Sequence, residues 1–196
     1  MQKYINITAK GYIVYLRVLE YSCCSRRLLV HFLKQRFFFL PMTTGLFIGR
    51  FQPFHNAHLA DVKMALGMVT HLYIGIGSSQ ECGTEKNPFS VAERKDMISS
   101  VLKEEGITSY SFIEVEDCES DDEWVSKVES LCSFSIVFTG NEWTEKCFKN
   151  KGYEVVDVDM LPGISSTLIR ERMKKGGEWK HMVPKSVWED LSKRGI

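Results

Sequence analysis

Short apolar runs alternate with amphipathic stretches along the chain from Met42 onward. Residues 45–49 form an apolar run that ends in glycine, which is typical of a buried strand. The stretch from about 58 to 69 places Leu59, Val62, Leu66 and Val69 on one face of a helix. A second apolar run over 72–76 predicts another strand. We therefore expect a strand, turn, helix and strand at the start of a folded domain.

The alternation continues to the end of the chain. Ser90 is followed three residues later by Glu93, a capping box that predicts a helix start, and Gly106 is suited to the end of that helix. Strands are predicted at 110–115, 135–139 and 153–158, with helices at 123–131 and 142–149 and two final helices starting at Ser165/Ser166 and Pro184. This pattern predicts an α/β fold, a Rossmann-like doubly wound parallel sheet with helices on both faces.

The first 41 residues differ from the rest of the chain. The formal net charge of the whole protein is +0, but residues 1–41 hold seven Lys or Arg against one acid, or +6, which leaves −6 for 42–196. The segment shows no clear helical or strand periodicity. We expect an atypical N-terminal extension, 1–41, that arises from a wrongly assigned start with Met42 as the native initiator, followed by one domain over 42–196. A basic targeting arm is the alternative.

Composition limits the classes of partner. Zero net charge gives no overall attraction to nucleic acid or to an anionic membrane, and no apolar run reaches the roughly 20 residues of a membrane span. The six cysteines form no CxxC pair and no cluster with metal-ligand spacing, as in a cytoplasmic protein with reduced thiols. We expect no membrane partner, no nucleic-acid partner and no bound structural metal. A nucleic-acid binder built on residues 1–41 is a weak alternative, because no binding motif is visible there.

The turn after the first strand carries the first candidate chemistry, in the sequence Gly-Arg-Phe-Gln-Pro-Phe-His-Asn-Ala-His over residues 49–58. In a parallel sheet, ligands bind where such a turn leads into a helix N-terminus, whose free N–H groups attract phosphate. His55 and His58 can both direct imidazole donors at one polyphosphate. They can also simply cap or pack the helix, whereas a zinc site lacks further ligands of suitable spacing.

A second helix start offers another set of anion-binding groups. Ser165, Ser166 and Thr167 supply hydroxyl groups and backbone N–H groups, and Arg170 follows one turn later. Alone, this is an ordinary helix cap with a surface arginine. Together with the first motif, it predicts a site that holds two parts of one phosphate chain.

The motif Gly-x-Phe-x-Pro-x-His-x-x-His resembles the nucleotidyltransferase superfamily related to class I aminoacyl-tRNA synthetases, and its fuller form resembles the archaeal-type nicotinamide-nucleotide adenylyltransferases. Ala57 stands where that family usually has glycine. The resemblance implies transfer of AMP from ATP to nicotinamide mononucleotide (NMN), giving NAD and pyrophosphate by direct in-line attack, with magnesium accompanying ATP. The implied catalytic residues are Arg50, His55, His58 and Arg170, and the implied ATP-binding residues are Gly49, Phe51, Gln52, His55, His58, Ser165, Ser166, Thr167 and Arg170.

The resemblance also implies an NMN site and a homo-oligomer. Lys86 stands where the family has an arginine that meets the acceptor phosphate, and Asp121 stands where asparagine is typical. Trp124 corresponds to a tryptophan that stacks on the nicotinamide ring, although a helical tryptophan is more often part of the core. Residues 139–141 are similar to a family turn near the adenosine or nicotinamide pocket, so the implied NMN-binding residues are Lys86, Asp121, Trp124 and Asn141.

Two alternative functions remain open on the sequence. A sister adenylyltransferase would use nicotinate mononucleotide, phosphopantetheine or FMN as acceptor. A nucleotide-binding regulator would bind ATP without turnover.

Overall fold

The computed structural model describes residues 3–9, 12–18, 40–41, 43–158, 161 and 163–195. The chain divides into two compact units, Met1–Met42 and Thr43–Ile196. The start of the native chain at Met42 stays a prediction.

Antiparallel pairing characterises the first unit. β1 (Lys3–Ala9) pairs with β2 (Tyr12–Val18), and β2 pairs with β3 (Leu40–Pro41). The sequence reading predicted no regular element here. Tyr and Ile, which favour strands, occur in both long strands, with Thr in β1 and Val in β2. Consecutive apolar residues in β2 obscure the alternation by which a strand is recognised.

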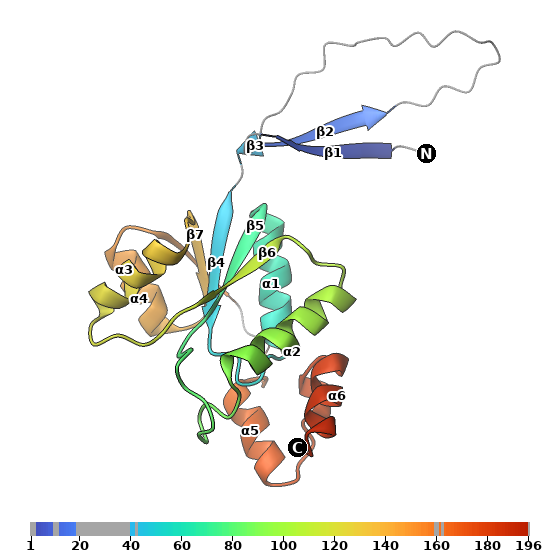
Figure 1. The fold of residues 1–196 in the computed structure, drawn as a ribbon, viewed down its shortest axis with the longest axis vertical. Coiled ribbons are helices and arrows are strands. Elements are labelled where there is room, and N and C mark those ends of the chain that lie inside the picture. Colours follow the sequence, from blue (N-terminus) through green and yellow to red (C-terminus); the bar gives the residue numbers. More distant parts are fainter. Residues whose placement is uncertain are drawn as a thin grey trace, which may run out of the picture. The chain divides into compact units, whose positions relative to one another are not determined.

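A five-stranded parallel sheet forms the centre of the second unit, in the order β6-β5-β4-β7-β8 (Figure 1). The predicted Rossmann-like sheet is confirmed. Its strands are β4 (Thr44–Gly49), β5 (His71–Ile76), β6 (Tyr110–Glu114), β7 (Ile136–Thr139) and β8 (Glu154–Asp157).

Helices cover both faces of this sheet, as predicted (Figure 1). One apolar core joins the sheet to α1 (Asn56–Met68) and α2 (Val91–Glu104), and α5 (Ser166–Lys174) and α6 (Lys185–Lys193) extend it. A second core joins the opposite face to α3 (Asp121–Leu131) and α4 (Glu142–Asn150). A short 3-10 helix, Lys180–Met182, precedes α6. No helix in the described ranges has the length and apolar character needed to cross a bilayer.

Local signals define the helix ends. Ser90 caps α2: its Oγ accepts a hydrogen bond from the Glu93 N–H at 3.3 Å, and its own N–H donates to Glu93 Oε2 at 2.8 Å. Gly106 follows this helix with φ 69°, a left-handed conformation that glycine adopts without a steric penalty. Pro184 is the N-cap of α6, one position before the first helical residue at which proline was predicted.

The strand order determines where a ligand can enter. After β4 the chain adds β5 and β6 on one side, and then β7 and β8 on the other. The order therefore reverses between β4 and β7, and the carboxyl ends of these two strands flank a crevice.

Candidate active site

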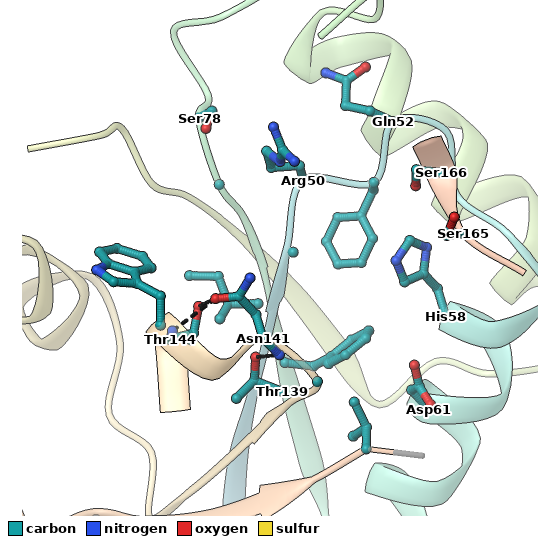
Figure 2. A pocket seen from close by; sticks show the side chains of 18 of the residues that line it. Arg50, Gln52, His58, Asp61, Ser78, Thr139, Asn141, Thr144, Ser165 and Ser166 are labelled. Carbon is teal, nitrogen blue, oxygen red and sulfur yellow. Dashed lines mark hydrogen bonds between the residues drawn. The ribbon is translucent and has the colours of Figure 1, made fainter. Parts of the chain in front are cut away.

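A cavity of about 450 Å³ lies at the carboxyl ends of β4, β5 and β7. Figure 2 shows its walls: His58, Ser165 and Ser166 lie on one side, Thr139, Asn141 and Thr144 lie on another, and Arg50 lies between them. The cavity is also lined by His55 and Arg170, so the residues of both predicted motifs face one space.

Two histidines cap the start of α1 reciprocally. The His58 N–H donates to His55 Nδ1 at 3.3 Å, and the His55 N–H donates to His58 Nδ1 at 3.3 Å. Because each Nδ1 accepts a hydrogen bond, the proton of each neutral ring lies on Nε2. Each ring therefore keeps one N–H donor that helix capping does not use.

Burial keeps both imidazoles neutral. The rings of His55 and His58 stack with their centroids 3.4 Å apart, and Phe51 packs edge-on against His58 at 4.9 Å. His55 is only 2% exposed, and this burial lowers its pKa to about 4. Burial, and then the neighbouring His55, lower the pKa of His58 well below its ordinary value. At neutral pH the pair offers N–H donors without carrying charge.

The start of α5 is hydrogen-bonded to the same turn. Ser165 caps α5 by accepting from the Leu168 N–H at 3.2 Å, and Ser166 Oγ donates to the Pro53 carbonyl at 3.0 Å. Arg170 Nη1 donates to the Gln52 carbonyl at 2.8 Å. Burial and the nearby Arg50 lower the pKa of Arg170 from its ordinary value. The two motifs thus form one structure, as the sequence predicted.

Several predicted ATP-binding residues shape the turn itself. Gln52 lines the cavity, but its side-chain amide exchanges hydrogen bonds with the backbone of Phe89, at 2.8 and 2.9 Å. Phe51 has φ 52°, and a Cβ on Gly49 would lie 3.1 Å from its ring. A side chain at position 49 would press on the Phe51 ring, which would have to move by a few tenths of an ångström. The direct contacts of Gly49, Phe51 and Gln52 with ATP stay predictions.

The four predicted NMN-binding residues do not all lie together. Trp124 and Asn141 line the cavity with the histidines, whereas Lys86 and Asp121 do not. Lys86 lines an adjacent cavity of about 960 Å³, which shares Arg50, Thr167 and Arg170 with the first. The assigned roles of these four residues stay predictions.

Trp143 is a pocket residue that the sequence reading did not select. Its side chain is 46% exposed, whereas Trp124, whose ring centroid is 4.7 Å away, is only 4% exposed. The Nε1–H of Trp143 donates to Asp121 Oδ1 at 3.0 Å, which fixes the indole. Its position two residues after Asn141, the N-cap of a helix at a strand's carboxyl end, was the available signal.

Over the ranges that the structure describes, no group of three or more His, Cys, Asp or Glu side chains is arranged to hold a metal ion. Asp61 and Asp117 line the first cavity separately.

Comparison with known proteins places the chain in a family. The model of the cytidylyltransferase-like family matches residues 46–172, which include both helix starts of the site. The chain belongs to this family.

The names of two curated relatives and of one similar solved structure share one activity. The nicotinamide-nucleotide adenylyltransferase of Picrophilus torridus is 45% identical over 143 residues, covering 71% of this chain and 85% of the relative. The enzyme of the same name from Pyrococcus furiosus is 40% identical over 162 residues, covering 79% of this chain and 86% of the relative. A bifunctional NMN adenylyltransferase/ADP-ribose pyrophosphatase from Francisella tularensis, solved with AMP and a manganese ion, is similar in structure with a TM-score of 0.63 and 26% identity. The match covers 72% of this chain and 44% of that longer protein.

The neutral His55 gives a testable dependence of stability on pH. The unfolded chain takes up a proton at this imidazole near pH 6.5, whereas the folded chain does so only near pH 4, so acidification favours unfolding. Between pH 7 and pH 4 we expect His55 to reduce the free energy of unfolding by about 3 kcal/mol. His55→Asn retains a capping side chain but not this titration. Urea unfolding of the wild type and of His55→Asn between pH 7 and pH 4 measures this difference. If the free energy of unfolding depended on pH equally in both proteins, the prediction would be contradicted.

Proposed function

We propose that this protein transfers AMP from ATP to nicotinamide mononucleotide, forming NAD and pyrophosphate. The observation that carries the proposal is the convergence of two helix starts, one with paired imidazoles and one with hydroxyls and Arg170, on one cavity. Relatives at 40–45% identity that carry this activity in their names support it.

The reaction needs no general base. An ionised oxygen of the NMN 5′-phosphate attacks the α-phosphorus of ATP, a new P–O bond forms, and the bond from that phosphorus to the bridging oxygen breaks. The electron pair of the broken bond leaves with pyrophosphate. The attacking phosphate is already a nucleophile at neutral pH, so catalysis depends on positioning the two substrates and stabilising charge.

Different residues of the cavity would bind different phosphate groups of the substrates. The Nε2–H donors of His55 and His58 would bind phosphate oxygens, and the capping hydrogen bonds already hold each ring in the tautomer that carries this proton. Arg50 and Arg170, which line both cavities, would neutralise charge on the leaving pyrophosphate. The hydroxyls and free N–H groups at Ser165, Ser166 and Thr167 would bind another part of the same chain.

A divalent ion would arrive with the nucleotide. We propose that magnesium would accompany ATP as part of the substrate and would offset negative charge on its phosphates. The manganese ion in the Francisella relative supports a divalent ion in general.

For the acceptor, we propose that the nicotinamide ring stacks on Trp143 and that Trp124 packs against this indole. Trp143 is the more exposed of the two indoles and lines the cavity. Asn141 accepts from the Thr144 N–H through Oδ1, which leaves its amide NH₂ for the acceptor. Lys86, beside Arg50 and Arg170 in the adjacent cavity, would contribute charge to the phosphate end.

The direct test is pyrophosphate release from magnesium–ATP with a panel of acceptors. We expect NMN to give the highest kcat/KM among NMN, nicotinate mononucleotide, phosphopantetheine and FMN. Preference for another acceptor would identify a sister adenylyltransferase, and no release with any acceptor would favour a nucleotide-binding regulator.

Changing His58→Ala removes one preorganised donor, so we expect kcat to fall on the order of 10²-fold. Lys63→Ala is the control, because Lys63 lies on the exposed face of the same helix and pairs with Glu105. The same pyrophosphate assay applies to both variants. Turnover at the wild-type level in His58→Ala would remove His58 from the mechanism.

Changing Trp143→Ala should raise the KM for NMN about five- to tenfold, the scale of about 1 kcal/mol for one aromatic contact. The KM for ATP should change little, and Trp143→Phe should restore most of the NMN affinity because it keeps a ring. Steady-state kinetics with each substrate varied in turn measure this. Equal changes in both KM values would argue against a stacking role.

A further inference from the structure

Arg94 is a buried cation that the mechanism above does not use. It lies in α2 with 0% of its surface exposed, and it forms no ion pair with any described residue. Backbone carbonyls surround it instead. Nη1 donates to the carbonyls of Arg50 at 3.1 Å and Gly77 at 2.8 Å, Nη2 to that of Ser78 at 3.2 Å, and Nε to that of Ser90 at 3.3 Å.

These hydrogen bonds join three segments near the cavity: the turn after β4, the turn after β5 and the start of α2. A buried charge without a carboxylate partner is costly, and only good hydrogen bonds offset that cost. A lysine could not replace it, because its single ammonium lacks the planar fork that reaches several carbonyls at once.

Two of the carbonyls that accept from Arg94 belong to residues directly before one with an unusual backbone conformation. Phe51 has φ 52° and Ser78 has φ 46°, and in the described part of the chain no other residue besides glycine has a positive φ. Phe51 follows the Arg50 carbonyl directly, and Ser78 follows that of Gly77. Each such conformation costs roughly 1 kcal/mol or more. The Arg94 hydrogen bonds stabilise both turns at the peptide where the chain enters the left-handed region.

Peptide geometry then determines where the N–H group of each of these two peptides points. In a trans peptide the C=O and the next N–H point in opposite directions. Phe51 and Ser78 both line the first cavity, whereas Arg94 does not. Because the carbonyls of Arg50 and Gly77 are turned to Arg94, the N–H groups of Phe51 and Ser78 on the other side of these two peptides face away from it. Neither N–H has an acceptor among the described residues.

We propose that Arg94 is a positioning residue for phosphate binding: it holds two peptides so that the Phe51 and Ser78 N–H groups face the cavity as donors to a phosphate oxygen. Figure 2 shows Ser78 and Arg50 side by side at one wall of the cavity, where such an anion would lie. The inference rests on the proposed function in one respect, since the natural anion would be a phosphate of ATP or of the acceptor.

Kinetics of two buried variants of α2 separate positioning from simple stability. Arg94→Lys keeps a positive charge but loses the fork, and we expect kcat/KM to fall about 10- to 100-fold. Met97→Ala, at a neighbouring position that is 2% exposed, removes core packing without touching these carbonyls. We expect it to lower Tm while kcat stays within about twofold of wild type. Both variants are assayed well below their Tm. In a third variant, Arg94→Ala, millimolar guanidinium should partly restore kcat/KM.

Amide NMR of the whole chain tests the donors directly, with inorganic tripolyphosphate as the probe. In the wild type we expect the amide signals of Phe51 and Ser78 to shift on binding, and in Arg94→Lys we expect these shifts to be lost. Wild-type kcat/KM in Arg94→Lys would overturn the proposal. Shifts at His55 and His58 without shifts at Phe51 and Ser78 would also overturn it. If the amides shift but no acceptor supports pyrophosphate release, the proposed function fails and the role of Arg94 stands.

Discussion

The site depends on the reciprocal hydrogen bonds of His55 and His58, because they divide the two nitrogens of each imidazole between different tasks. Nδ1 satisfies a backbone N–H at the start of α1, and Nε2 remains a donor. Stacking and burial keep the rings uncharged. The interpretation of these histidines as helix caps and their interpretation as phosphate ligands are therefore compatible. Capping fixes the ring orientation and the tautomer that the proposed phosphate binding would use.

A second constraint joins distant parts of the chain. The guanidinium of Arg170 and the hydroxyl of Ser166 bind carbonyls of Gln52 and Pro53, more than 110 residues earlier. The turn after β4 thus receives hydrogen bonds from α5 and from Arg94 in α2. A reaction that relies on positioning two phosphate groups benefits from such a turn, since little reorganisation is needed when charge moves from the α-phosphate to the leaving group.

Local signals predicted most of the fold. The Ser90–Glu93 capping box and Gly106 give the ends of α2 because each acts within a few residues. The meeting of the two motifs followed from the rule that parallel strands end at one edge. Which tryptophan is exposed depends on how α3 packs against α4, so the sequence pointed to Trp124 but not to the more exposed Trp143, although both line the cavity. No role for Arg94 followed from the sequence, because its partners are backbone carbonyls, which every residue has.

The segment between β5 and α2 is tied at both ends. Gln80 exchanges hydrogen bonds with Asp117 near its beginning, and Gln52 holds Phe89 at its end. Residues 82–86 between these ties are all exposed, and they include a wall of the adjacent cavity. We expect changes of sequence there to act on the adjacent cavity first, because the hydrogen bonds at both ends hold the flanking residues in place. Descendants of one ancestral enzyme could in this way diverge in acceptor preference while inheriting an unchanged means of activating ATP.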